Sequence, residues 1–168
     1  LPHPGEGNAP DFLNGEGAVA QLMHAEPDPS KHVLAHVFKI TADPFVGKLG
    51  IFRVHQGTVR SGAQLLVGDG RKPVKFAHIY QLQGKEHAEI TQAIPGDICA
   101  VPKIDEIHFD AVLHDSHDED QIHLKPVDFP KPMFGLAIEA ATRGQEQKLS
   151  TALHKHYTVE EVVAFAAS

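Results

Sequence analysis

Histidines and carboxylates crowd one short segment of this 168-residue chain, HDSHDEDQIH at residues 114–123. Its candidate metal ligands are His114, Asp115, His117, Asp118, Asp120 and His123. Imidazole and carboxylate groups at this spacing could hold zinc or nickel if the segment folded back on itself. No helical pattern fixes the spacing, so we favour a solvated acidic loop and assign no metal site to this chain.

The usual nucleophiles of covalent catalysis are absent or shielded. No Gly-x-Ser-x-Gly motif occurs. The single cysteine, Cys99, lies in the apolar run ICAV. A thiol buried among apolar side chains has a raised pKa and behaves as a small hydrophobic group. We therefore predict no catalytic residue in this chain.

The chain also lacks a nucleotide-binding loop. Such a loop reads GxxxxGK followed by Ser or Thr, because its amides surround the phosphates while the lysine supplies charge and the hydroxyl binds magnesium. Gly47-Lys48 and Gly84-Lys85 are preceded by Ala42 and Ile79 where the first glycine belongs. The guanine-reading motif Asn-Lys-x-Asp is missing as well. We expect no nucleotide cofactor here.

Positive charge is concentrated in one part of an acidic chain. The net charge is -7, yet residues 39–85 carry eight basic and two acidic side chains, a local charge of +6. A basic face on an acidic chain is typical of a module that meets phosphate with one surface. Solvated strand faces and edge lysines explain the pattern equally well. By charge, the candidate RNA contacts are Lys48, Arg60, Arg71, Lys72 and Lys75.

Strand patterns dominate the middle of the chain. Runs rich in β-branched and aromatic residues, bounded by Gly, Pro or Asp, cover residues 32–41, 48–59, 63–68, 73–83 and 97–104. No helical period of comparable strength appears before residue 140. The fold class predicted is therefore mainly β, with an antiparallel β-barrel.

Three segments are expected along the chain. Residues 1–30 are rich in Pro and Gly, and we predict an extended linker there. We assign residues 31–126 to the barrel and residues 127–168 to the truncated start of another domain. In the last segment we expect a strand after Pro132 and a helix over residues 143–156, capped by Thr142 with Gln145. A lone strand and helix cannot bury their apolar faces alone, so we expect them to dock on the barrel, to form an oligomer by docking on another chain, or to stay poorly ordered.

Several blocks of sequence resemble one family. They are KITADPFVGKLGIFRVHQGTVRSG at residues 39–62, GKE at 84–86, PGDICAV at 95–101, FPKP at 129–132 and AIEA at 137–140. In this order they resemble the translational GTPases, and most of all elongation factor G and its elongation-factor-G-like relatives. The resemblance implies a β-barrel of the translation-factor type, the second domain of such a protein, followed by part of a third, ferredoxin-like α+β domain. The GTPase domain would lie outside this chain, which starts at Leu1 and not at a Met.

The resemblance also implies partners. In the family this barrel contacts ribosomal RNA of the small subunit, packs against the GTPase domain and moves with the third domain during translocation. Arg53 matches a basic position of the family, and the strand-connecting, interdomain loop corresponds to Asp43, Pro44, Phe45, Val46 and Gly47. GTP and magnesium would belong to the parent protein, which we expect to be a cytoplasmic elongation factor. No apolar run approaches the roughly 20 residues that a membrane-spanning helix needs.

One block departs from the family pattern. Where the family usually has Thr-Gly-Asp-Thr-Leu, this chain has IDEIHFDA at residues 104–111. The missing glycine alters a tight turn and points to an elongation-factor-G-like paralogue, while the release-factor and tetracycline-protection branches stay open. The alternatives are a free-standing RNA-binding or protein-interaction barrel and, less favoured, a small metal-binding enzyme.

The missing motifs predict that the purified chain neither binds nor hydrolyses GTP. Calorimetric titration with GTP and magnesium should show no saturable heat, because no loop is present to surround the phosphates. Binding of one GTP per chain would overturn this prediction.

Overall fold

The computed structural model describes residue 7 and residues 10–43, 47–84, 86–125, 133–134 and 137–156. The chain divides into two units, Leu1–Pro126 and Val127–Ser168. The first unit holds every described strand, and the second holds the described α-helix. Each unit is considered by itself below.

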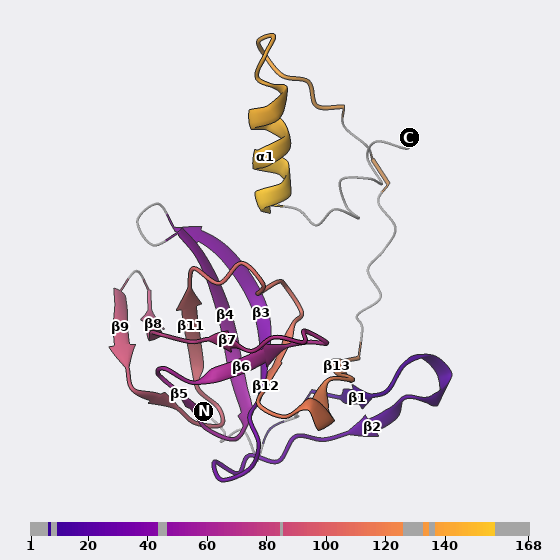
Figure 1. The fold of residues 1–168 in the computed structure, drawn as a ribbon, viewed down its shortest axis with the longest axis vertical. Coiled ribbons are helices and arrows are strands. Elements are labelled where there is room, and N and C mark those ends of the chain that lie inside the picture. Colours follow the sequence, from indigo (N-terminus) through magenta and orange to yellow (C-terminus); the bar gives the residue numbers. More distant parts are fainter. Residues whose placement is uncertain are drawn as a thin grey trace. The chain divides into compact units, whose positions relative to one another are not determined.

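An antiparallel sheet of eight strands forms the body of the first unit, with the order β7-β6-β12-β3-β4-β11-β8-β9 (Figure 1). Its strands are β3 (Leu34–Asp43), β4 (Gly47–Gln56), β6 (Gln64–Val67), β7 (Val74–Lys75), β8 (Ile79–Gln83), β9 (Glu86–Ile90), β11 (Ile98–Pro102) and β12 (Val112–His114). Two further strands, β5 (Val59–Arg60) and β10 (Gln92–Ala93), pair with each other. The mainly β prediction is confirmed, in the form of an eight-stranded antiparallel half-barrel.

The core lies inside this curved sheet, and the long β3–β4 hairpin supplies its centre. Val37 pairs with Phe52 in register, and both side chains are fully buried. The Phe52 ring meets Phe76 edge to face, with centroids 6.1 Å apart. Cys99 packs into the same core, as its apolar sequence context predicted. Burial raises the pKa of this thiol to about 12, so it is a core side chain and not a nucleophile.

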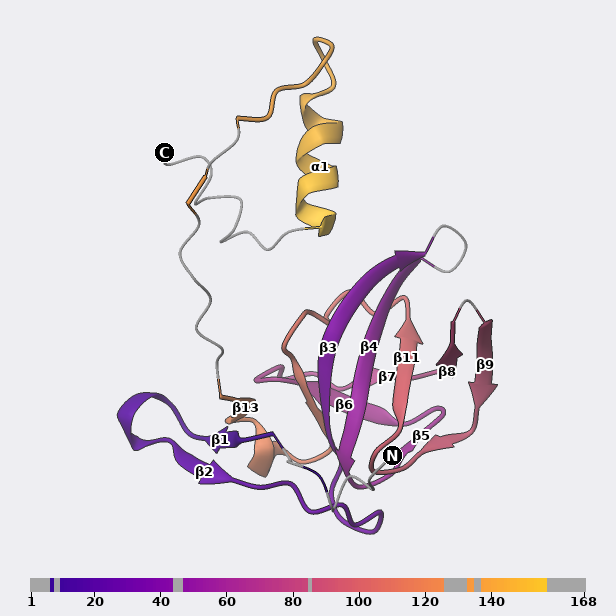
Figure 2. The ribbon, with the colours of Figure 1, turned by 180° about the vertical axis from the view of Figure 1, so that it is seen from behind.

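Part of the N-terminal segment is folded, which corrects the expectation of an extended linker over residues 1–30. Strands β1 (Phe12–Asn14) and β2 (Gln21–Met23) form a hairpin around a 3-10 turn at Gly17–Val19. On its other side, β1 pairs with β13 (Ile122–Leu124), giving a three-stranded sheet (Figure 2). Phe12 explains the difference, because its buried ring anchors a second small core with neighbours that include Leu34 and Ile122.

Other strand boundaries also differ from the predicted runs. Residues 73–83 form two strands because they pair with different partners: β7 pairs with β6, whereas β8 pairs with β11 and β9. Strand β9 has the sequence EHAEI, and four of its five residues are exposed. It was missed because polar residues occupy both of its faces, which leaves no hydrophobic alternation to detect.

In the second unit, α1 (Glu146–His156) confirms the predicted helix but starts three residues later than expected. Gly144 has φ +89°, a conformation that no α-helix continues through. The Gln145 amide instead closes a turn on Thr142 O at 3.2 Å, so Thr142 is not the cap. The strand expected after Pro132 is not seen at residues 133–134 or 137–140, and its other residues lie outside the described part of the chain.

No helix among the described residues is long and apolar enough to cross a membrane.

Gly57 lies where two segments of backbone come close together. Its φ is +74°, and a Cβ there would lie 2.6 Å from His32 O and 2.7 Å from Val33 Cα. Gly62 offers a matched comparison, because its φ is +83° but nothing lies within 4 Å of its Cβ position.

The Gly62→Ala variant should therefore lose about 1–2 kcal/mol of unfolding free energy, the usual cost of the left-handed conformation. The Gly57→Ala variant adds a backbone clash and should lose about 3–5 kcal/mol. Urea unfolding followed by circular dichroism measures both. Equal losses would show that the His32 backbone yields and that the close approach costs nothing.

His55 joins the N-terminal hairpin to the outer side of β4. Its ring meets Phe12 edge to face, with centroids 5.3 Å apart. Burial, together with the nearby charges of Arg53 and His36, lowers the pKa of His55 to about 4. The unfolded chain takes up this proton near pH 6.5, whereas the folded chain resists it until about pH 4. Stability is therefore unaffected by this group at neutral pH and is lost as the pH falls through that window.

Replacing His55 by Phe should remove this loss while keeping an aromatic ring against Phe12. Between about pH 7 and about pH 5, the unchanged chain should lose about 2 kcal/mol more unfolding free energy than His55→Phe. Urea unfolding at a series of pH values measures the difference. Parallel pH profiles for the two proteins would contradict the assigned burial effect.

Candidate nucleic-acid interface

Three of the candidate RNA-contact residues lie together in the structure. Arg71 and Lys72 lie in the turn between β6 and β7, and Lys75 ends β7. All three are exposed, and with Glu106 they line a hollow of about 620 Å³. Because β7 is an edge strand of the sheet, this hollow is open to a large partner. The hollow brings three cations and one carboxylate to a single surface, which we call the β7 hollow.

Lys48 lies beside the β7 hollow through its contact with the loop after β11. Its ammonium donates to Asp105 O at 2.8 Å, and Asp105 precedes the hollow residue Glu106. Lys103 joins this group, because its amide donates to Lys48 O at 2.9 Å. Lys103 has φ +58°, which turns the chain sharply after β11. Lys48 and Lys103 are therefore neighbours of the loop that supplies Glu106 to the β7 hollow.

Arg53 lies on β4 but not on the same side as Lys48. The two residues are an odd number of positions apart on one strand, so their side chains point to opposite faces. Arg53 is flanked in the sheet by His36 on β3 and Ile98 on β11. Its Nε is buried without a hydrogen-bond partner among the described residues. Arg53 therefore belongs to the outer face of the sheet and not to the β7 hollow.

His36 adds a hydrogen bond with Asp110 to this outer face. Its Nε2 lies 2.8 Å from Asp110 Oδ1, and the His36 side chain is only 14% exposed. Burial lowers the pKa of His36, while the Asp110 carboxylate opposes that effect.

Arg60 is separated from the other candidates. It lies on β5, and its guanidinium donates to Gln92 Oε1 on the neighbouring strand β10 at 2.9 Å. The structure thus brings Arg71, Lys72 and Lys75 together, places Lys48 beside them, and leaves Arg53 and Arg60 on other surfaces.

The loop expected to contact other domains joins β3 to β4. Asp43 pairs with Gly47 at the end of the hairpin, and Gly47 has φ +86°. This positive φ fits the shaped loop that the Asp-Pro-Phe-Val-Gly pattern predicts. Residues 44–46, which include Pro44, Phe45 and Val46, lie outside the described part of the chain.

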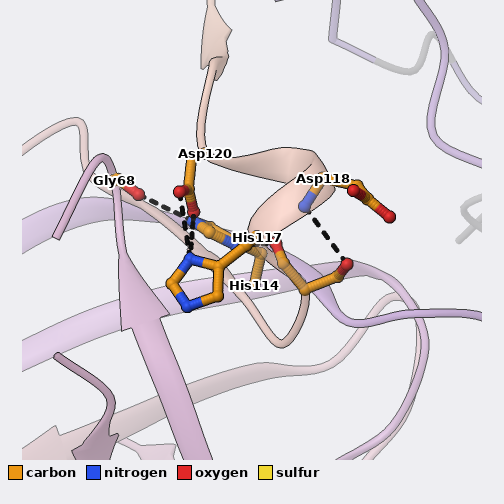
Figure 3. A network of polar contacts seen from close by, with 6 residues as sticks. Gly68, His114, His117, Asp118 and Asp120 are labelled. Atoms are coloured by element: carbon orange, nitrogen blue, oxygen red, sulfur yellow. Dashed lines mark hydrogen bonds and ion pairs between the residues drawn. The ribbon is translucent and has the colours of Figure 1, made fainter. Parts of the chain in front are cut away.

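The histidine-rich segment is not an open loop in the structure. Residues 117–119 form a 3-10 turn, and His114 is fully buried at the end of β12 (Figure 3). Glu119 contributes a buried Oε2 without a partner among the described residues, and burial raises the pKa of its carboxyl. No group of three or more His, Cys, Asp or Glu side chains in the described residues is arranged to hold a metal ion.

Two residues of the interface were missed from sequence. Lys103 lies outside the basic stretch at residues 39–85, and only its place after a strand, in the motif AVPK, could have drawn attention to it. Glu106 lies 31 residues after Lys75 in an acidic stretch, and no local pattern connects the two. The pairing of β11 with β4 brings the segment that holds both residues beside Lys48.

Comparison with known proteins agrees with this architecture. A crystal structure of a protein from Thermus thermophilus is similar to this chain, with a TM-score of 0.62 and 29% sequence identity. The match covers 75% of this chain but only 19% of the Thermus chain. This chain therefore corresponds to a small part of that larger protein.

The sequence model of one family also matches, and it does so over residues 32–113. These residues run from just before β3 to β12 and contain nearly the whole eight-stranded sheet together with the β7 hollow. Residues 32–113 of this chain therefore match elongation factor G domain 2, and the matched region is this half-barrel.

Proposed function

We propose that this chain is a non-catalytic, ribosome-binding part of an elongation factor of the elongation factor G type. In this proposal the half-barrel contacts phosphates of small-subunit ribosomal RNA through the β7 hollow. The observation that carries the proposal is the grouping of Arg71, Lys72 and Lys75 around one exposed hollow in a domain of this family.

The chemistry of the β7 hollow suits a phosphate backbone. Arg supplies planar donors for phosphate oxygens, and Lys supplies compact charge on a flexible stem. Lys48 and Lys103 lengthen the basic surface, which allows contact with more than one phosphate. Glu106 lies among the cations and would repel a phosphate placed too deep in the hollow. Contacts of this kind position an RNA without reading its sequence.

The proposed parent protein supplies what this chain lacks. GTP, magnesium and the hydrolytic residues would belong to its GTPase domain, and the loop at residues 43–47 would meet a neighbouring domain. The second unit would be the start of a ferredoxin-like third domain, and it would dock on parts of the parent that complete its sheet. The proposed location is the cytoplasm, where ribosomes work.

Salt-dependent RNA binding tests the role of the β7 hollow. A fluorescently labelled fragment of small-subunit ribosomal RNA is titrated with the 168-residue chain at several salt concentrations, and anisotropy reports binding. The triple variant Arg71→Gln, Lys72→Gln, Lys75→Gln should bind about tenfold or more weakly at low salt. Its plot of log affinity against log salt should be shallower by about 2, since each lost phosphate contact removes about 0.7–0.9 from the slope.

A control variant that loses the same number of positive charges distinguishes a specific role of the β7 hollow from a general effect of net charge. The triple variant Lys31→Gln, Arg60→Gln, Lys125→Gln also removes three cations, but from other surfaces: Lys31 is ion-paired with Glu26, and Arg60 is bonded to Gln92. It should bind nearly as well as the unchanged chain. Equal weakening in both triple variants would contradict the β7 hollow as the site. Absence of salt-dependent binding by the unchanged chain would favour a protein-interaction role.

A further inference from the structure

His114 is the buried histidine of the half-barrel. It ends β12 with a fully buried side chain, and in the described residues the other buried polar side chain is Gln56. Its Nδ1 lies 2.8 Å from Ser116 O, and its Nε2 lies 2.7 Å from Gly68 O. Both ring nitrogens therefore face backbone carbonyl oxygens at hydrogen-bonding distance (Figure 3).

The chemistry of these partners decides the protonation of the ring. A carbonyl oxygen only accepts hydrogen bonds, so each nitrogen must donate. A neutral imidazole has one N–H and one lone pair, and in either tautomer the lone pair would face a carbonyl oxygen inside the protein. Such a buried acceptor pair is costly, because neither oxygen nor nitrogen is then satisfied. Only the imidazolium form, with two N–H groups, satisfies both contacts.

Carboxylates near His114 offset the buried charge. Asp120 Oδ1 lies 3.7 Å from His114 Nε2, and Asp120 also accepts from His117 Nδ1 at 3.0 Å. The charge of His114 also acts on the carboxyl of Glu119, whose pKa is raised by burial and lowered by this neighbour. Other charged or titratable groups on the surrounding elements are Asp115, Asp118 and His32, which act on Glu119, and Asp69, Arg71 and Lys72 in the turn after β6. Asp120 is therefore placed to offset the charge of an imidazolium.

His114 connects three separate pieces of the first unit. It belongs to β12, it binds the turn after β6 through Gly68 O, and it binds the start of the next segment through Ser116 O. That segment contains the 3-10 turn at residues 117–119 and leads into β13, which pairs with β1. The Gly68 amide also donates to Val112 O at 2.7 Å, so this turn is held to β12 independently of the ring.

We propose that His114 is held as an imidazolium and works as a proton-dependent latch that fastens residues 116–124 to the half-barrel. Loss of the proton removes one of the two donors and leaves a lone pair against a carbonyl oxygen. The Gly68 turn stays in place, so the segment that yields is the one beginning at Ser116. The latch is closed when the ring is protonated and opens as the pH rises.

Nitrogen NMR of the unchanged chain tests the protonation state directly. An unperturbed histidine titrates near about pH 6.5 and is mostly neutral at neutral pH. In a long-range proton–nitrogen spectrum at neutral pH, both ring nitrogens of His114 should resonate in the protonated range, with the ring signals assigned by triple-resonance spectra of the unchanged chain. One unprotonated His114 nitrogen at neutral pH would overturn the proposal, and this readout requires no variant to fold.

Amide hydrogen exchange tests the latch. In His114→Gln, the amides of residues 118–124 should exchange about tenfold or more faster, while those of β3 and β4 stay protected. His108→Gln is the control, because His108 is exposed and, within the described part of the chain, its ring hydrogen-bonds only to Glu106 O in its own loop, at 3.1 Å. Unchanged protection of residues 118–124 in His114→Gln would overturn the latch even if the ring is an imidazolium.

Discussion

The pairing of β3 with β4 is the constraint on which the half-barrel depends. These two ten-residue strands occupy the middle of the eight-stranded sheet, with β12 beside β3 and β11 beside β4. Their inward residues, among them Val37 and Phe52, form the centre of the core, and their outward residues are fixed by the same alternation. A slip by one residue would exchange the two faces. It would bury Arg53 and expose Phe52, so the position of every other strand follows from this one register.

The same register distributes the positive charge. Basic residues that are close in sequence are separated, because alternation sends Lys48 and Arg53 to opposite faces of β4. Residues that are distant in sequence are gathered, because the loop after β11 returns to Lys48 and brings Glu106 to the β7 hollow. A chain of net charge -7 can therefore present one compact basic surface. The distribution of charge along the sequence identified the basic stretch at residues 39–85, but only the fold shows which of its residues share the β7 hollow.

Sequence predicted the central strands well, since β-branched runs bounded by Gly, Pro and Asp have few alternatives to a buried strand. Prediction from sequence failed where contacts between distant parts of the chain determine the local structure. Strand β9 is polar on both faces and is recognised only by its pairing with β8. The helix start was misplaced because the positive φ of Gly144 overrides an apparent capping box. His114 lies in an acidic stretch typical of a solvated loop, yet it is buried because Gly68, 46 residues earlier in the chain, supplies an acceptor.

The small sheet of β2, β1 and β13 has a mechanical consequence. Phe12 pairs with Leu124, and Lys125 N donates to Asp11 O at 3.0 Å, so the chain enters β1 and leaves β13 at the same end of one antiparallel ladder. Tension between these two points would load the hydrogen bonds one after another, as in a zipper, and not all together in shear. The Asp11–Lys125 bond would break first. This edge is therefore a weak point of the first unit when force is applied between Asp11 and Lys125.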